Sequence, residues 1–201
     1  QSRIQWDTLV ASHDLHFVFV KATEGGDYVD SLFAYNWGEL CRLEMRRGAY
    51  HFFRPRVSGR LQARHFLNVV QPEPGDFAPV LDIETTDGVA IEEMIEQARI
   101  WLLTMERELG VRPIIYTNMK FYNRYLAGVF DHYPLWVARY SETHPDLRNG
   151  RLWQFWQHSD RGRLTGIIEP VDLNRFAGKV EDLETFLIPI RPRPDRPFSA
   201  P

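Results

Sequence analysis

The sequence predicts an α/β fold: one domain built as an irregular (β/α) barrel of the TIM type. Strand-like and helix-like segments alternate along the chain, which is typical of βαβ units around a parallel sheet. About seven segments are strand candidates, which is too many for a small open sheet and close to the number in a barrel. The last connections are too short for full helices, so we expect the barrel to be irregular.

The first half of the chain supplies three strands and two helices. Residues 17–25 are rich in β-branched and aromatic side chains and break at a glycine pair, as a strand does. Residues 31–48 carry apolar side chains at helical spacing and end on glycine, and 49–55 form a short strand halted by proline. A helix is predicted over 59–72, followed by a buried strand over 78–84.

The second half begins with the strongest helix prediction, over 91–110. Its apolar residues recur every three or four positions, acids cluster in its first turn, and a glycine closes it. The remaining predicted elements are strands over 112–118, 133–140, 150–159 and 169–178 and short helices over 121–127 and 180–187. We expect residues 1–188 to form the barrel and residues 189–201, which hold five of the 13 prolines, to form an extended tail.

Composition excludes several classes of function. A formal net charge of -3 and the absence of a basic run give no reason to expect nucleic-acid binding. The longest apolar stretches are strand-sized, so no membrane-spanning helix is expected. Cys41 is the only cysteine, which rules out a disulfide within the chain and a Cys-based zinc site. The histidines lack metal-ligand spacing, so we expect no metal and no other cofactor.

Two carboxylates end the strand "APVLDIE". Asp82 and Glu84 are two residues apart, so in an extended strand they share one face. Two acids so near each other raise each other's proton affinity, and one can hold a proton while the other stays ionised. We expect Glu84 to hold it. A D-x-E pair alone is a weak signal, because acids at strand ends also cap helices or pair with arginine.

In a barrel, the carboxyl ends of the strands form the rim that carries the active site. The predicted rim combines acids, aromatic rings and amides: Glu24, Tyr50, His51, Phe53, Asp82, Glu84, Tyr116, Asn118, Trp136, Tyr140, Trp153, Gln154, Asp172 and Asn174. Sugar rings stack on aromatic faces, and glycoside hydrolysis needs two carboxyl groups around the scissile bond. We expect His51 to be a structural hydrogen-bonding residue and Trp153 and Trp156 to lie on opposite faces of one strand.

Seven segments, in this order and spacing, resemble glycoside hydrolase family 25, the N-acetylmuramidases or lysozymes that cut peptidoglycan. They are "FVFVKATEG", "GAYHFF", "PVLDIE", "PIIYTN", "PLWVARY", "LWQF" and "VDLNRF". The resemblance runs from about Ile4 to Phe176. It implies a flattened, irregular α/β barrel that hydrolyses the β-1,4 bond between N-acetylmuramic acid and N-acetylglucosamine. The family's first strand, which carries an aspartate, would lie just before Gln1, so that strand is apparently missing from this chain.

The resemblance also implies residue roles. Glu84 matches the general acid, Asp82 its partner and Asp172 a third acid in the cleft. Tyr116 matches a tyrosine that contacts the acetamido group, while Trp136 and Tyr140 match sugar-facing positions. We expect further substrate contacts from these rim residues: Glu24, Tyr50, Trp153 and Gln154. The implied partner is peptidoglycan, and the protein is expected to be a monomer that is secreted or associated with the cell envelope.

Two alternatives stay open at the level of sequence. The barrel could be a non-catalytic cell-wall glycan-binding protein, an interpretation motivated by the missing first acid. It could also be another carboxylate enzyme. A chitinase of the acetamido-assisted type would need aspartates where Ala78 and Val80 stand, and a metal-dependent phosphodiesterase would need more convergent ligands.

Overall fold

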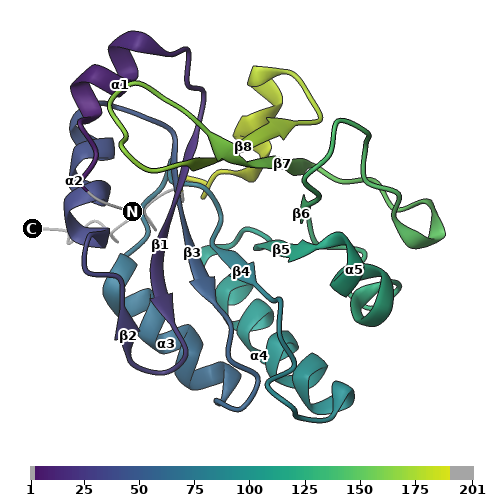
Figure 1. The fold of residues 1–201 in the computed structure, drawn as a ribbon. Coiled ribbons are helices and arrows are strands. Elements are labelled where there is room, and N and C mark those ends of the chain that lie inside the picture. Colours follow the sequence, from purple (N-terminus) through teal and green to yellow (C-terminus); the bar gives the residue numbers. More distant parts are fainter. Residues whose placement is uncertain (1–2, 191–201) are drawn as a thin grey trace, which may run out of the picture.

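The computed structural model describes residues 3–190, and within them eight strands form one curled sheet (Figure 1). The strand order across the sheet is β2-β1-β3-β4-β5-β6-β7-β8. The strands are β1 (Val18–Glu24), β2 (Tyr28–Val29), β3 (Arg47–Phe52), β4 (Val80–Asp82), β5 (Ile114–Asn118), β6 (Leu135–Ala138), β7 (Phe155–Gly162) and β8 (Val171–Phe176). The predicted irregular α/β barrel is confirmed in the form of a half-barrel, because β2 and β8 lie at the two ends of the sheet.

Strand direction divides the sheet into a parallel centre and two antiparallel ends. β1, β3, β4, β5, β6 and β7 are parallel to their neighbours. β2 folds back on β1, and β8 runs antiparallel to β7. The parallel strands bring their carboxyl ends to one edge, as the sequence predicted. The short connection between β7 and β8 reverses the chain instead of crossing over the sheet.

Helices α2 (Phe33–Arg42), α3 (Gly59–Val70) and α4 (Ile91–Leu109) cover the outer face of the sheet (Figure 1). α3 and α4 pack closely enough that only glycine fits at the first residue of α3. A Cβ on Gly59 would lie 2.0 Å from the carbonyl oxygen of Gln97. The Gly59 amide donates to the Gln97 side chain at 2.8 Å, so α4 supplies the hydrogen bond that the start of α3 would otherwise lack.

Several boundaries differ from the predictions. The predicted helix over 31–48 ends at Arg42, and the next strand begins at Arg47 rather than 49. Burial explains the change, since the Arg47 guanidinium pairs with Asp76 at 2.7 Å inside the protein. The remaining short elements are α1 (Trp6–Ser12), α5 (Met119–Phe121), the π-helical turn η1 (Tyr122–Leu126) and the 3₁₀ segments η2 (Arg148–Gly150) and η3 (Val180–Phe186). Neither α1 nor β2 was predicted. Residues 191–201 of the predicted tail lie outside the described residues.

The two faces of the sheet bury separate hydrophobic clusters. The outer cluster fills the space between the sheet and the helices, with Leu81, Phe66 and Trp101 among its members. The inner cluster lies inside the curl and includes Phe77, Phe155 and Leu183. Alternation along each strand explains this division, because Leu81 points out to the helices while Val80 and Asp82 point into the curl.

Candidate active site

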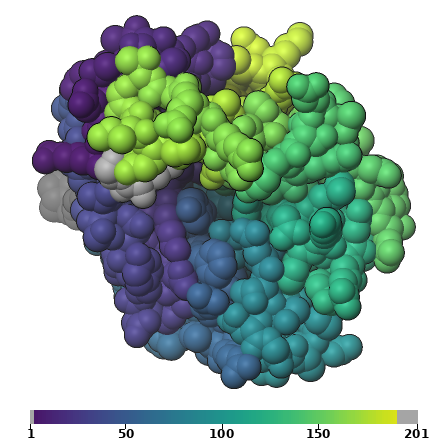
Figure 2. Space-filling view, in the orientation of Figure 1, coloured from purple at the N-terminus to yellow at the C-terminus, as the bar shows by residue number. Residues whose placement is uncertain are grey.

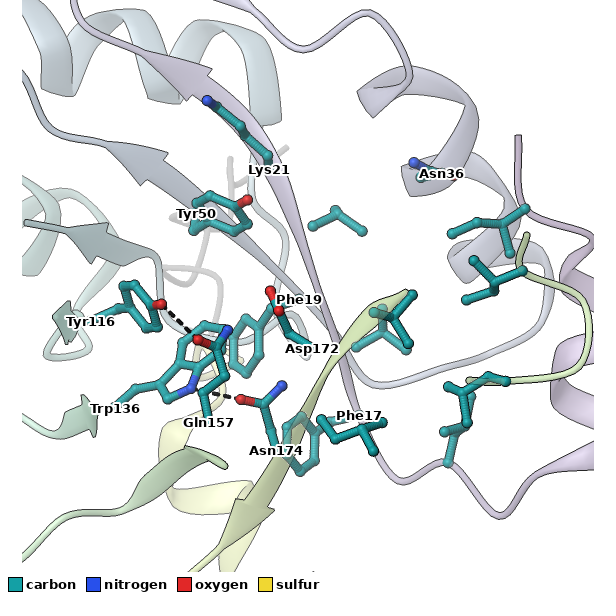
Figure 3. Close-up of a pocket in the computed structure, with 18 of the residues that line it drawn as sticks. Phe17, Phe19, Lys21, Asn36, Tyr50, Tyr116, Trp136, Gln157, Asp172 and Asn174 are labelled. Carbon is teal, nitrogen blue, oxygen red and sulfur yellow. Dashed lines mark hydrogen bonds between the residues drawn. The ribbon is translucent and has the colours of Figure 1, made fainter. Parts of the chain in front are cut away.

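A cavity of about 830 Å³ opens inside the curl of the sheet, where the molecular surface is hollowed between the purple N-terminal part and the teal and green parts (Figure 2). It runs from the carboxyl ends of β3–β6 along β1 to β8. Seven predicted site residues line this cavity: Tyr50, Asp82, Glu84, Tyr116, Trp136, Tyr140 and Asp172. Residues as far apart in sequence as Tyr50 and Asp172 therefore meet at one site (Figure 3).

Asp82 ends β4, the strand between β3 and β5, and its side chain is 5% exposed. Burial, the charge of Glu84 and a hydrogen bond with the Glu84 side chain raise the pKa of Asp82 well above its usual range. Asp82 Oδ1 has no hydrogen-bond partner within residues 3–190. A buried oxygen without a partner faces a cost that protonation or a bound ligand relieves.

Glu84 lies two residues beyond Asp82 and is only half-buried. Asn118 Nδ2 donates to Glu84 Oε2 at 3.4 Å. The sequence predicted that Glu84 would be the desolvated member of the pair. The structure places the deeper burial at Asp82, and burial is the largest cause of the raised pKa of Asp82.

Asp172 comes from β8 and lines the same cavity as the acid pair. Burial, followed by the charges of Asp160 and Glu84, raises its pKa. An ion pair with Arg139 or Arg175 would be the structural explanation for Asp172. The structure gives those arginines other partners: Arg139 donates to the His144 carbonyl, and Arg175 lies over the Trp156 ring.

An aromatic wall joins the acids. The Trp136 ring packs against Tyr116 and Phe19, with centroid distances of 4.7 and 4.8 Å. Its Nε1 donates to Asn174 Oδ1 at 2.8 Å (Figure 3). Glycine at position 48 makes room for this wall, because a Cβ there would lie 2.2 Å from the Phe19 ring. A rigid aromatic face beside carboxylates suits the apolar face and the hydroxyls of a sugar.

Gln157 is a cavity residue that the sequence analysis missed. The dipeptide Trp-Gln occurs twice, at 153–154 and 156–157, and only the first copy was predicted to contact the substrate. β7 begins at Phe155, so the second copy lies in the strand, and Gln157 lines the cavity while Trp156 is fully buried. Strand alternation alone does not choose between the two copies, because the choice depends on where the strand begins.

Trp153 and Gln154 lie outside the cavity lining. Gln154 Oε1 accepts a hydrogen bond from the Leu135 amide at 2.7 Å, a contact between chain segments at the start of β6. The Trp153 ring stacks on His144 and lies 5.7 Å from the Trp156 ring. The two tryptophans thus pack together instead of occupying opposite faces of a strand, since Trp153 precedes the strand.

Glu24 is also outside the lining, although it ends β1 at the correct rim. Its carboxylate binds Lys21 at 2.7 Å and Arg54 at 2.6 Å. Burial alone would raise its pKa, but the hydrogen bonds from Lys21 and Arg54 outweigh burial and lower the pKa. The ion pairs with Lys21 and Arg54 explain why an acid stands at position 24 without a role in substrate binding. Of these three residues, Lys21 lines the cavity.

His51 has the structural role predicted for it. The buried ring accepts from Thr23 Oγ1 at Nδ1, 2.7 Å away, and donates from Nε2 to Gln62 Oε1 at 2.9 Å. The Gln62 orientation fixes this tautomer, because its Nε2 donates to the carbonyls of Arg54 and Val57. Burial lowers the pKa of His51 to about 4.

Within residues 3–190, no group of three or more His, Cys, Asp or Glu side chains is arranged to hold a metal ion. The helices of the same part of the chain are too short or too polar to cross a membrane.

Comparison with known proteins identifies the family. The model of "Glycosyl hydrolases family 25" matches residues 1–167. The chain is 44% identical over 198 residues to YegX of Escherichia coli strain K12, covering 96% of this chain and 72% of that protein. It is 32% identical over 197 residues to Lysozyme M1 of Streptomyces globisporus, covering 91% and 67%. A solved family 25 glycosyl hydrolase from Bacillus anthracis superposes with a TM-score of 0.85 at 30% identity, covering 92% of this chain and 88% of that one. The chain is therefore a glycoside hydrolase and belongs to family 25.

Proposed function

We propose that this enzyme hydrolyses the β-1,4 bond between N-acetylmuramic acid and N-acetylglucosamine in peptidoglycan. The observation that carries the proposal is the placement of Asp82 and Glu84, two residues apart at the end of β4, in one cavity with Trp136. Membership of family 25 and similarity to Lysozyme M1 support peptidoglycan as the substrate. We further propose that the protein acts as a monomer on wall glycan strands, outside the cell or in its envelope.

Glu84 is the proposed general acid. It is the more accessible member of the pair, and its proton passes to the bridging oxygen as the bond from that oxygen to the anomeric carbon breaks. Positive charge then develops at the anomeric carbon and is stabilised by the ionised carboxylates around it, for which Asp172 is placed in the same lining. Water supplies the hydroxyl group to that carbon, and its proton returns to the acid pair.

The test is Glu84→Gln, which keeps the shape of the side chain and removes the proton that it transfers. We expect the release of new reducing ends from purified peptidoglycan to fall by about two orders of magnitude or more, as general acid catalysis predicts, while glycan binding persists. Asp82→Asn should also slow the reaction, because it removes the second carboxyl group beside Glu84 in the cavity. Glu96→Gln is the matched control, since that side chain is 61% exposed on α4.

The assay also separates enzyme from binding protein. If the wild-type protein binds peptidoglycan and releases no reducing ends, the non-catalytic alternative replaces the proposal. Equal rates for the wild type and Glu84→Gln would instead retain the enzyme and remove Glu84 as its acid.

A further inference from the structure

Gln157 joins two tyrosines that belong to different elements of the site. It lies on β7, is 3% exposed and lines the cavity. Its Oε1 accepts from the hydroxyl of Tyr116 on β5 at 2.8 Å and from the hydroxyl of Tyr140, which follows β6, at 3.1 Å. Figure 3 shows the bond to Tyr116 and the amide nitrogen of Gln157 on the other side of the side chain.

These contacts assign a direction to the two phenolic protons beside Gln157. Burial and neighbouring acids raise the pKa of Tyr116 and of Tyr140, so both phenols keep their single proton at neutral pH. Each proton is directed at Gln157 Oε1, and this oxygen then has both lone pairs occupied. The phenolic oxygens are left as acceptors, so Tyr116 does not donate to the Asp82–Glu84 pair.

The amide nitrogen of Gln157 is the complementary group. Within residues 3–190, no hydrogen bond joins its Nε2 to another residue. A buried carboxamide nitrogen that lines a cavity offers its N–H groups to whatever occupies that cavity. Tyr116 and Tyr140 therefore present two acceptor oxygens to the cavity, and Gln157 presents one donor nitrogen. All three lie within reach of a single ligand group.

We propose that Gln157 is a positioning and specificity-determining residue: it holds Tyr116 and Tyr140 as acceptors and donates to the substrate itself, a combination that selects an N-acetylated sugar. An acetamido group has one N–H for a tyrosine oxygen and one carbonyl for Gln157 Nε2. An unsubstituted amine has no acceptor and leaves the Gln157 donor unpaired, which a buried site penalises. The inference rests on the proposed glycan hydrolysis.

The experiment compares two substrates with each variant. Purified peptidoglycan and the same material after enzymatic removal of its N-acetyl groups are assayed for new reducing ends, and the ratio of kcat/KM on the two is measured. The acids of the cavity attract the cationic amine of the de-N-acetylated substrate in every variant alike. This attraction therefore cancels when the ratios of two variants are compared. We expect Gln157→Leu to lower this preference for the acetylated substrate by about ten- to hundredfold, the discrimination that one unpaired buried donor supplies.

Two further variants identify the route. Gln157→Glu keeps the acceptor and loses the donor, so it should lose the preference as well. In a Tyr116→Phe background, Gln157→Leu should have a smaller effect than in the wild type, because part of its action passes through Tyr116. Gln154→Leu is the matched control: it removes a partly buried glutamine hydrogen bond outside the cavity and should lower the melting temperature without changing the preference.

The outcomes separate this inference from the proposed function. If Gln157→Leu slows both substrates equally, Gln157 has only a structural role and the inference is overturned. If the wild type releases no reducing ends from either substrate, the proposed function fails. In that event the binding of N-acetylated and de-N-acetylated chito-oligosaccharides to the wild type and Gln157→Leu still decides the matter, and an unchanged binding preference overturns the role of Gln157.

Discussion

Trp136 is held on two sides, by a hydrogen bond from its indole nitrogen to Asn174 and by packing against Phe19. Replacing it with phenylalanine keeps a ring and removes the donor and part of the stacking face. We expect Trp136→Phe to weaken the binding of N-acetylated glycan fragments by about three- to tenfold, on the order of 1 kcal/mol. Calorimetric titration in a Glu84→Gln background measures this without turnover.

Trp153→Phe is the control for that titration, because Trp153 stacks on His144 outside the cavity. Its glycan affinity should match that of the unchanged background. A loss of affinity in Trp153→Phe and none in Trp136→Phe would mean that the aromatic wall has been assigned to the wrong tryptophan.

At this scale, the sequence predicts a residue well when its neighbours along the chain decide its position. Asp82 and Glu84 could be placed together because strand alternation is local. Gln157 could not, because two Trp-Gln dipeptides three residues apart fit the same pattern and only the start of β7 distinguishes them. Glu24 reaches the predicted rim but binds Arg54, a partner 30 positions away that no local pattern reveals.

Elements are joined through buried polar contacts, and His51 provides one with a measurable pH dependence. It links β3 to Thr23 of β1 and to Gln62 of α3. The folded pKa is about 4 and lies below the ordinary value of 6.5, so folding favours the neutral ring. This contribution to stability is complete above pH 6.5 and is lost as the pH falls toward 4, by about 3 kcal/mol across that window.

Urea unfolding from pH 7 to pH 4.5 tests the element-scale prediction. The free energy of unfolding of the wild type should fall toward that of His51→Gln as the pH decreases. The difference between the two proteins is the quantity to follow, because Asp82 and Asp172 have raised pKa values and act in the opposite direction. His132→Gln, at an exposed side chain in the turn before β6, is the matched control. A constant difference between the wild type and His51→Gln would contradict the assignment.

The elements differ in how far sequence could predict them. α4 begins and ends within one residue of its prediction, because its apolar spacing, Glu92 and Glu93 in its first turn and the glycine at its end are all local. The start of β3 depends on the Arg47–Asp76 pair and was misplaced. β2 has only two residues and carries no periodic pattern. Alternation also cannot tell a parallel strand from an antiparallel one, so the reversal at β8 was missed.

The whole molecule depends on its last described element to close the inner cluster. η3 places Leu183, 1% exposed, against aromatic residues from strands far earlier in the chain. We expect Leu183→Ala to lower the free energy of unfolding by about 2–5 kcal/mol through lost burial and an unfilled cavity. Chemical denaturation measures this, and Leu152→Ala, at a side chain that is 75% exposed, should change stability by no more than about 0.5 kcal/mol. Similar losses for the two variants would mean that η3 does not seal the core.

The α/β class and the barrel-like curl followed from the alternation of elements, and the shared rim followed from parallel strands. The incomplete closure did not, because whether the end strands meet depends on the summed twist and register of the whole sheet.

The acid pair and the third acid occupy unequal places in this sheet. Asp82 and Glu84 are separated by one residue at the end of a central strand, so covalent geometry keeps them together for as long as β4 stays between its neighbours. Asp172 is on β8, which in the described part of the chain pairs only with β7 and lies at the edge of the sheet. Edge hairpins open at a lower free energy than central strands. We therefore expect heating to separate Asp172 from the acid pair, and so to inactivate the enzyme, at a lower temperature than that of global unfolding.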